Sequence, residues 1–173
     1  VCSSDLAGLM EPAKGTVPPG HPWWGNPKFD IKYDPDAARK LMGEAGFSKA
    51  RPLTVKIQTS ASGSGQMMPL PMNELMQQNL ADCFFKVELD VIERNTLFTN
   101  WRRGAKDETA RGAHAINVTF AAMDPFFAMA RFLDSKMAPP TSNNWGFVND
   151  PEFDKLVAEA RSTFDAAARD AAL

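Results

Sequence analysis

Two short segments in which apolar and polar residues alternate, with a helical pattern between them, constrain the fold of this chain most strongly. In residues 52–59, aliphatic side chains stand at every second position: Leu53, Val55 and Ile57. Residues 84–93 repeat the alternation with Phe85, Val87, Leu89 and Val91. A period of two is typical of a β-strand with one buried face. Each segment is therefore predicted to be such a strand, with polar residues such as Gln58 on the opposite face.

Helical patterns precede both strands. Residues 34–46 have Asp34 as a plausible N-cap, Pro35 in the first turn and Gly46 as a left-handed stop. One apolar face of this helix is expected to consist of Ala38, Leu41, Met42 and Ala45. A second helix is predicted from Pro69 or Pro71 to about Asp82, with an apolar stripe of Met72, Leu75, Met76 and Leu80.

The same alternation of element types continues to the end of the chain. Residues 95–104 are typical of a short helix, and the apolar run 115–122 predicts a third, buried strand. Three further helices are predicted, with Asp124, Asp150 and Asp165 as their N-caps. The apolar face of the helix after Asp150 is expected to consist of Phe153, Leu156, Val157 and Ala160. This order predicts an α/β layer architecture with at least some parallel strand pairs.

Charge and cysteine content exclude several classes of protein. The formal net charge is −2 without a dense basic cluster, so no nucleic-acid partner is expected. No apolar run approaches the roughly 18 residues of a membrane-spanning helix. Cys2 and Cys83 are too few for a disulfide framework. Cys83 ends an apolar helical pattern and is expected to be a small buried hydrophobic residue.

Catalytic and metal-binding motifs are not evident. The run ASGSG, residues 61–65, has Gly63 where a nucleophile elbow needs serine. Neither His21 nor His114 has a carboxylate, histidine or cysteine at metal-ligand spacing. We therefore expect no enzyme activity, no metal and no cofactor. Aromatic residues near the ends of predicted elements favour binding in an aromatic-lined cleft, although each is also compatible with the core: Trp101, Phe120, Phe126, Phe127 and Trp145.

The chain divides into three regions by composition. Residues 1–6, VCSSDL, resemble a translated sequencing adapter and are predicted to be non-native. Residues 7–33 are rich in proline and glycine and are interpreted as an extended connection between lobes. Residues 34–173 are interpreted as an α/β ligand-binding lobe, incomplete at its C-terminus because the last helix stops without a capping residue. We expect a piece of a larger protein, truncated at both ends.

Three segments together resemble a known family: KYDPDAARKLMGEAG, NELMQQNLADCFFKVELDVIE and NNWGFVNDPEFDKLVAEARSTFDAAARD. They are similar to the C-terminal lobe of the family 5 extracellular solute-binding proteins, the peptide, dipeptide, nickel and oligosaccharide receptors of ABC importers. The resemblance implies one lobe of a two-lobed periplasmic-binding-protein (type II) fold, with a mixed sheet flanked by helices and closure by hinge motion.

The resemblance also implies partners and a location. A small solute would be bound between the lobes of a monomeric receptor and delivered to the transmembrane permease of an ABC importer. The receptor would reside in the periplasm, or outside a Gram-positive cell as a membrane-anchored protein. Two alternatives are a solute sensor that feeds a chemoreceptor without transport, and a secreted hydrolase lobe.

The family's pocket is expected at two places in this lobe. After the second strand, many members have an aromatic residue following an acidic one, whereas this chain has Glu93 and Arg94. Trp101 could supply the missing aromatic surface, and Trp145 could support the cleft wall or contact the ligand. The second place is the third strand and its exit, with the candidate residues Val118, Thr119, Phe120, Ala121 and Met123.

The exit of the third strand also bears on the class of ligand. Peptide receptors of the family usually present an aspartate there, which meets the peptide's ammonium group. The corresponding residue here is Ala121, and Asp124 is interpreted as a helix N-cap. We therefore predict a ligand other than a peptide held by its free α-amine, such as a sugar or an opine-like compound, with Arg94 available for a charged group.

Overall fold

The computed structural model describes residues 20–21, 24, 33–62, 68–118 and 124–172. The chain separates into two compact units. The first takes its described residues from within Ile31–Thr99 and Ala110–Phe120, and the second from within Ala13–Asp30, Asn100–Thr109 and Ala121–Leu173. Within the described part of the chain, no helix is both long and apolar enough to cross a bilayer.

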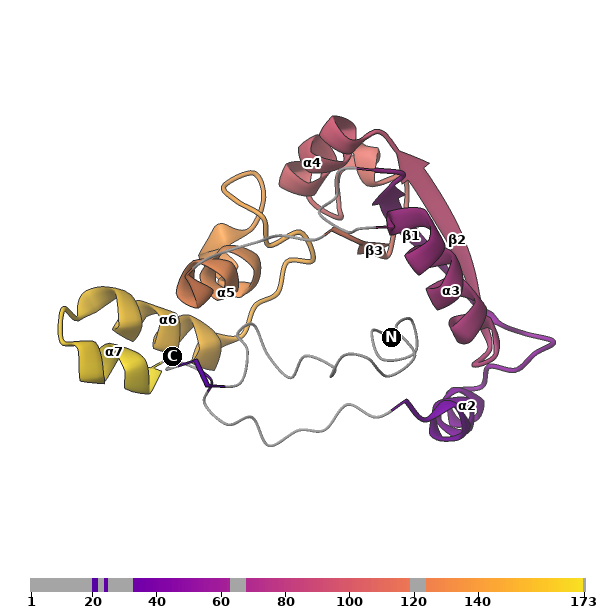
Figure 1. Ribbon diagram of the computed structural model, residues 1–173, viewed down its shortest axis with the longest axis horizontal. Helices are drawn as coiled ribbons and strands as arrows, with labels where there is room; N and C mark the ends of the chain where they lie inside the picture. The colour runs from indigo at the N-terminus through magenta and orange to yellow at the C-terminus, as the bar shows by residue number, and fades with distance from the viewer. Residues whose placement is uncertain (1–19, 22–23, 25–32, 63–67, 119–123, 173) are drawn as a thin grey trace. The chain divides into compact units, whose positions relative to one another are not determined.

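The first unit is built on a parallel sheet (Figure 1). β1 (Leu53–Ser60) lies between β2 (Phe85–Ile92) and β3 (Ala115–Ile116), and both pairs are parallel. The first two predicted strands are thereby confirmed. The third is much shorter than predicted, because Asn117 and Val118 have already left the ladder. The rest of that predicted strand, residues 119–122, lies outside the described residues.

The first helix of this unit, α2 (Pro35–Glu44), begins and ends where the sequence predicts. The Asp34 side chain accepts a hydrogen bond from the backbone N–H of Ala37 at 2.8 Å, and Gly46 follows the helix with φ +86°. The expectation of a buried apolar face is wrong for Leu41, which is 65% exposed, and for Ala45. The reason is that none of the described helices or strands packs extensively over α2.

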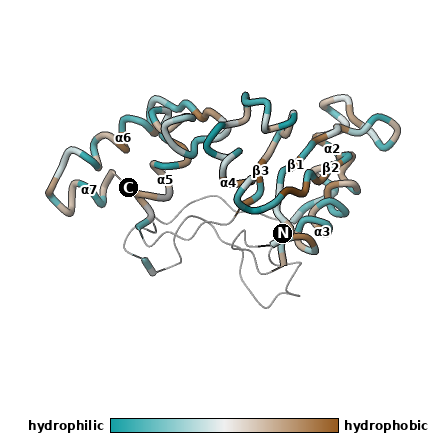
Figure 2. The backbone as a smooth tube through the Cα atoms, turned by 90° about the horizontal axis from the view of Figure 1, so that it is seen from above, coloured by the Kyte–Doolittle hydropathy of each residue, from teal (hydrophilic) through white to brown (hydrophobic). Residues whose placement is uncertain are grey.

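The core of the first unit lies between the sheet and α3 (Pro69–Ala81), which packs on β1 and β2. Figure 2 shows hydrophobic segments along these strands and α3. The buried apolar side chains include the predicted Cys83: Ile57, Cys83, Val87 and Leu97. The predicted apolar stripe of α3 is only partly buried, and its fully buried side chain is instead Asn73.

Strand burial departs from simple alternation. Gln58, Thr59 and Ser60 are all fully buried at the carboxyl end of β1, so the expectation of an outward-facing Gln58 is wrong. A central strand of a parallel sheet is covered on both faces, so its alternate positions need not reach solvent. Val91, expected to be buried, is exposed because β2 is the outer strand of the described sheet.

The second unit is helical in its described part. It contains α5 (Pro125–Leu133), the 3₁₀ turn η2 (Ser135–Met137), α6 (Pro151–Ser162) and α7 (Ala166–Ala172). The three predicted N-caps are confirmed: Asp124, Asp150 and Asp165 accept hydrogen bonds from backbone N–H groups two or three residues onward. Each carboxylate also suits the positive end of the helix dipole.

Helix α6 packs against both of its helical neighbours, α5 and α7. Val157 and Ala160 are buried, as predicted, but Leu156 is exposed. In Figure 2, hydrophilic and hydrophobic segments are mixed along α6 and α7. Helix α4 (Arg94–Arg103) begins in the first unit and ends in the second, and η1 (Glu108–Ala110) is a short 3₁₀ turn.

Candidate functional site

The carboxyl end of the parallel sheet carries a chain of polar contacts that runs from the buried Gln58 to the exposed Arg111. Gln58 donates through Nε2 to Oδ2 of Asp90 at 3.0 Å and to the Ala110 carbonyl oxygen at 3.3 Å. Arg111 donates to the other oxygen of Asp90 at 2.5 Å. The three side chains link β1, β2 and the segment before β3. This arrangement fixes the edge of the sheet at which α/β folds place their ligands.

A second polar chain runs from α3 to the residue after β3. Asn73 donates through Nδ2 to Thr59 Oγ1 at 3.2 Å and to the Pro69 carbonyl at 2.7 Å. Its Oδ1 accepts from Asn117 Nδ2 at 2.7 Å, and the Asn117 N–H donates to the Gln58 carbonyl at 2.8 Å. Asn117 is thereby held at the start of the segment that leads to the predicted pocket residues.

Two of the predicted binding residues in the first unit can be placed. Arg94 is exposed, with its guanidinium 5.4 Å from the centre of the Phe98 ring. Val118 is half-buried directly after Asn117. Thr119, Phe120, Ala121 and Met123 lie outside the described residues. Binding by these six residues therefore stays a prediction.

Glu93 has a structural role at the start of α4. Its carboxylate accepts a hydrogen bond from the backbone N–H of Thr96 at 3.0 Å. Hydrogen bonds from the backbone of Asn95 and Thr96 hold the pKa of Glu93 below its ordinary value. The acidic residue of the predicted pair thus caps the helix that carries Arg94.

Trp101 is a packed residue of the second unit. It is 5% exposed and stacks on Phe132 with ring centres 5.1 Å apart and an interplanar angle of 12°. Its Nε1–H donates to the Asn143 carbonyl at 3.1 Å. This geometry supports the alternative that Trp101 belongs to the core. Contact with ligand stays a prediction, restricted to the ring surface that Phe132 leaves uncovered.

Trp145 lies in a tightly bonded loop. The fully buried Asn144 donates through Nδ2 to the carbonyls of Asp134 and Val148 at 3.1 and 2.7 Å, and accepts from the Val148 N–H at 2.8 Å. Trp145 is itself buried, and its carbonyl accepts from the Ala105 N–H at 3.0 Å. These hydrogen bonds therefore hold the loop in one conformation. Ligand contact by Trp145 stays a prediction alongside this supporting role.

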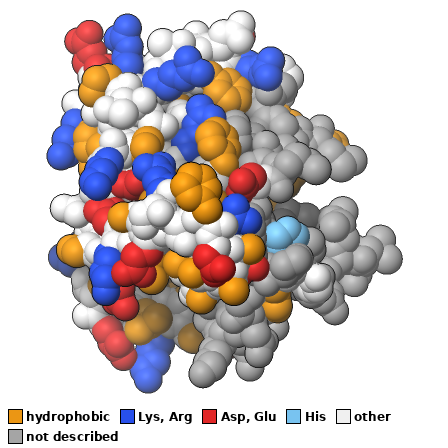
Figure 3. Space-filling model, turned by 90° about the vertical axis from the view of Figure 1, so that its left-hand side faces the viewer, with side chains coloured by type: hydrophobic (Ala, Val, Ile, Leu, Met, Phe, Trp, Pro, Cys, Tyr) orange, Lys and Arg blue, Asp and Glu red, His pale blue; other side chains and the backbone are white. Residues whose placement is uncertain are grey.

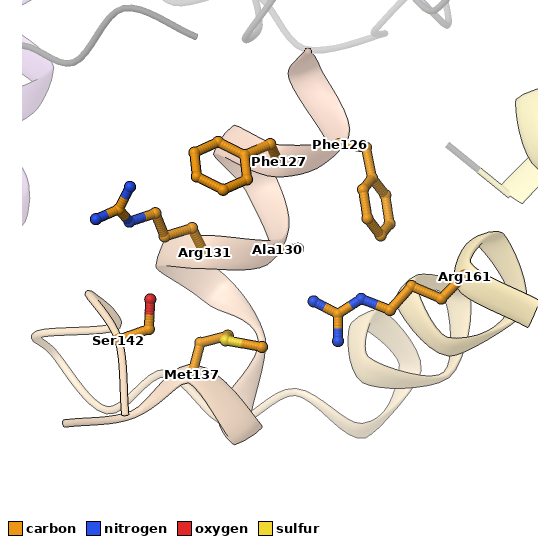
Figure 4. Close-up of a pocket in the computed structure, with 7 residues that line it drawn as sticks. All are labelled: Phe126, Phe127, Ala130, Arg131, Met137, Ser142 and Arg161. Carbon is orange, nitrogen blue, oxygen red and sulfur yellow. The ribbon is translucent and has the colours of Figure 1, made fainter. Parts of the chain in front are cut away.

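A pocket of about 350 Å³ lies between α5, η2, the following loop and α6. Figure 4 shows the residues that line it: Phe126, Phe127, Ala130, Arg131, Met137, Ser142 and Arg161. Apolar side chains supply most of the surface, and two guanidinium groups with one hydroxyl supply the polar part. Such a composition, an apolar cavity with a few polar groups, is typical of small-molecule sites.

The two arginines of the pocket are each stacked on a phenylalanine. Arg131 lies 5.3 Å from the ring centre of Phe127, and Arg161 lies 5.6 Å from that of Phe126. Arg131 also donates through Nε to Asn143 Oδ1, and Arg161 lies 3.6 Å from the buried Asp134 carboxylate. The contacts with phenylalanine, Asn143 and Asp134 restrict the orientation of both guanidinium groups. In Figure 3, Lys and Arg side chains are interspersed with hydrophobic ones.

Electrostatics single out Arg131. Burial lowers the pKa of Arg131 from its ordinary value, and the positive charge of Arg102 lowers it further. A second pocket of about 330 Å³ adjoins the first, because Arg131 and Ser142 line both; its remaining lining residues are Arg102, Pro140, Thr141 and Asn143. Phe126 and Phe127 are recognisable from the sequence as candidates for binding, whereas Arg131 and Arg161 are not among the predicted residues. The available signal was an arginine within the otherwise apolar helix DPFFAMARFL.

Metal ligation has no support in the described part of the chain. Among those residues, no group of three His, Cys, Asp or Glu side chains is placed to hold a metal ion. His114 is engaged with β1, since its Nδ1 accepts from the Lys56 N–H at 3.0 Å. The described residues therefore offer packed tryptophans, hydrogen-bonded polar side chains at the sheet edge and an apolar pocket with two arginines.

Comparison with known families gives one assignment over most of the chain. The family model for bacterial extracellular solute-binding proteins, family 5 Middle, matches residues 3–139. No curated protein matches the chain.

Solved structures show the same fold. NikA from Staphylococcus aureus in complex with Ni(L-His)2 is 18% identical, with a TM-score of 0.73 over 99% of this chain. A dipeptide-binding protein from Pseudoalteromonas sp. SM9913 in complex with Met-Leu is 24% identical, with a TM-score of 0.73 over 92%. OppA from Haemophilus influenzae in complex with RPPGFSPFR is 26% identical, with a TM-score of 0.57 over 80%.

The chain spans only part of each of these proteins: 34% of NikA, 30% of the dipeptide-binding protein and 25% of OppA. The α/β fold of a lobe of a periplasmic binding protein, predicted from the sequence, is thus confirmed.

Proposed function

This chain belongs to the bacterial extracellular solute-binding proteins of family 5, and we propose that it is part of the receptor of an ABC importer. The receptor captures a small solute and delivers it to the membrane permease. Its place is outside the cytoplasmic membrane, in the periplasm or anchored to the surface of a Gram-positive cell. The match of the family over residues 3–139 is the observation that carries this proposal. The relatives are binding proteins, not enzymes.

We infer that full affinity requires more than this chain. The chain spans about a third of NikA, and ligand pockets in proteins bury most of the ligand surface. One lobe by itself forfeits the contacts that a second lobe supplies on closure. The structural feature that supports the binding role is the carboxyl edge of the parallel sheet, where Gln58, Asp90, Asn73 and Asn117 fix the strand ends.

The test compares the chain with the complete product of its gene. A thermal-shift screen of the complete product against peptides, sugars, opine-like compounds and nickel–histidine complexes identifies the solute, because a ligand at 100 times its Kd adds about 2.7 kcal/mol of stability. Isothermal titration of both proteins with that solute should show much weaker binding to this chain. Equal affinities would contradict the two-lobe binding mode, and no stabilising solute would contradict the receptor role.

We further propose that the solute is not a peptide held by its free α-amine. The resemblance to the family implies that Ala121 stands where its peptide receptors usually place an aspartate. Asp124, the next acidic residue along the chain, is the N-cap of α5 and accepts from the N–H groups of Phe126 and Phe127 at 2.9 and 3.4 Å. An ammonium group left unpaired in a closed cleft costs several kcal/mol.

Dipeptides and their N-acetyl derivatives provide the test of the ligand class. Both should bind weakly and to similar extents, because Ala121 replaces the aspartate that is expected to meet the amine. Tight binding of dipeptides that is lost on acetylation would show that the inference is mistaken.

A further inference from the structure

The short strand β3 is attached to β1 by a side chain as well as by its backbone. β3 has only two residues, Ala115–Ile116, and His114 stands directly before it. The backbone N–H of His114 donates to the Lys56 carbonyl oxygen at 2.8 Å, and the imidazole Nδ1 of His114 accepts from the Lys56 N–H at 3.0 Å. These two hydrogen bonds, here called the His114 clamp, bind both polar backbone groups of Lys56.

The acceptor role of Nδ1 requires one protonation state of the imidazole. In a neutral ring one nitrogen carries the proton and the other accepts, so the proton must be on Nε2 of His114. A protonated ring carries an N–H at both nitrogens and would set a donor against the Lys56 N–H. A backbone donor that loses its acceptor costs stability. The side-chain half of the clamp therefore exists only with the neutral imidazole.

Charged groups near the clamp come from β1, from β2 and from the segment before β3. Lys56 donates through Nζ to the Arg111 carbonyl oxygen at 2.8 Å, and Arg111 forms an ion pair with Asp90 on β2 at 2.5 Å. Glu88 is the partner of Lys56 in the β1–β2 register and lies 3.6 Å from Lys86. Both carboxylates thus already have a cationic partner. A positive charge on the imidazole would add to those of Lys56 and Arg111.

His114 is exposed, so its ring exchanges protons with the bulk solvent. Imidazole is the ordinary side chain whose charge changes between pH 5 and 8. We propose that His114 is a pH-sensitive clamp, which holds β3 on β1 while the imidazole is neutral and weakens this pairing as the pH falls. The clamp is a property of this chain alone. Only its use rests on the proposed function, because a receptor outside the cytoplasmic membrane meets the pH of its surroundings.

The position of the clamp gives it an effect on the carboxyl edge of the sheet. β3 leads to Asn117, whose N–H donates to the Gln58 carbonyl at 2.8 Å and whose side chain donates to Asn73 at 2.7 Å. These bonds hold one end of the strand, and the clamp holds the other. Acid therefore loosens the strand at one end without removing its attachment at Asn117.

Amide hydrogen exchange measures the clamp directly. The ¹⁵N-labelled chain is compared at pH 8 and pH 5 through protection factors, which remove the intrinsic pH dependence of exchange. The protection factor of the Lys56 amide is divided by that of Val87, which is buried on β2 at the opposite edge of β1 and reports opening of the whole sheet. This ratio should fall by roughly fivefold or more at pH 5, as expected for the loss of one hydrogen bond.

Three variants identify the group that titrates. His114→Asn keeps an acceptor that does not titrate, because Oδ1 of asparagine is bonded to Cγ as Nδ1 of histidine is. Its protection ratio should equal that of the parent chain at pH 8 and stay there at pH 5. His114→Phe keeps a ring without an acceptor, so its ratio should be low at both pH values. His21→Gln removes the other histidine of the chain and should respond to pH as the parent does.

Four results would overturn the proposal: a parent ratio that is equal at both pH values, an equal fall in His114→Asn, full protection of Lys56 in His114→Phe, or ring ¹⁵N shifts that place the proton on Nδ1 at pH 8. Thermal melts establish that each variant is folded, and if His114→Phe does not fold, the parent and His114→Asn decide. The receptor function is tested separately, with solutes on the complete gene product. Failure of that solute screen leaves the clamp measurable in this chain.

Discussion

Replacement of Trp101 decides between a core residue and a ligand anchor. Three features determine the expected loss of stability: the stacking on Phe132, the hydrogen bond to the Asn143 carbonyl and the nearly complete burial of the indole. Aromatic pairs contribute about 0.5–1.5 kcal/mol beyond burial, and a hydrogen bond about 1 kcal/mol. With the cavity that remains, Trp101→Ala should lower the free energy of unfolding by about 3–5 kcal/mol.

Trp101→Phe is the matched conservative variant. It keeps an aromatic ring for Phe132 but removes the indole N–H. The Asn143 carbonyl still accepts from the Trp145 N–H at 2.7 Å, so it does not become an isolated buried acceptor. The expected loss is therefore only about 1–2 kcal/mol, from one hydrogen bond and the smaller buried area.

Urea melts of this chain measure both losses. For an m-value of about 2 kcal/mol per molar urea, Trp101→Ala should lower the midpoint by about 2 M and Trp101→Phe by less than about 1 M. The solute found by the thermal-shift screen is then titrated into the same variants of the complete gene product. An unchanged melt of Trp101→Ala, together with binding weakened by about 2 kcal/mol or more, would refute the core assignment.

Three other changes test the second unit. Asn144→Ala removes three hydrogen bonds of a buried side chain and should cost about 2–4 kcal/mol in a urea melt; a change below about 1 kcal/mol would contradict the fixed-loop description. Gly104→Ala places a Cβ 2.8 Å from Pro139 Cγ at φ +88° and should cost at least about 2 kcal/mol; an unchanged melting temperature would refute it. Hydrogen bonds from the Ser135 hydroxyl and N–H hold the pKa of Asp154 below its ordinary 3.8, so their stabilisation is complete above 3.8 and is lost as pH falls through the lower folded-state pKa. Ser135→Ala should therefore flatten the fall in melting temperature below pH 4, and an identical pH profile would count against this.

Local signals in the sequence were sufficient to predict where these helices begin. Asp34, Asp124 and Asp150 each precede a proline, and each caps its helix as predicted. Capping by aspartate and the preference for proline both act within the first helical turn. The carboxylate reaches the nearest N–H groups, and the N–H that proline lacks would have no partner within the helix at that position. The central strands were predictable for the same reason, since alternation is a property of neighbouring residues.

Burial was less predictable because it depends on what covers each element. Leu41 has the spacing of a core residue, but none of the described elements packs extensively over α2. Gln58 has the spacing of a surface residue, but a parallel sheet is covered on both faces, and the Gln58 side-chain NH2 donates to Asp90. Only the tertiary neighbours decide these two cases.

The candidate pocket was only partly accessible from sequence. Its phenylalanines were recognisable because aromatic residues at element ends favour binding. Arg161 lies about 30 residues after Arg131 in the printed sequence, and their common pocket depends on how α6 packs on α5. No local pattern contains that information. The arginine in the apolar helix α5 was the single local hint.

The loop around Asn144 should tolerate an inserted peptide less well than the connection between α6 and α7. Tolerance of an inserted peptide depends on the burial and hydrogen bonding of the backbone at that point. In the first loop, one amide side chain ties together Asp134 and Val148, so an insertion there would separate bonded partners. At Phe164 the side chain is fully exposed, and α6 has already ended. A fluorescent reporter or an affinity tag therefore belongs at Phe164.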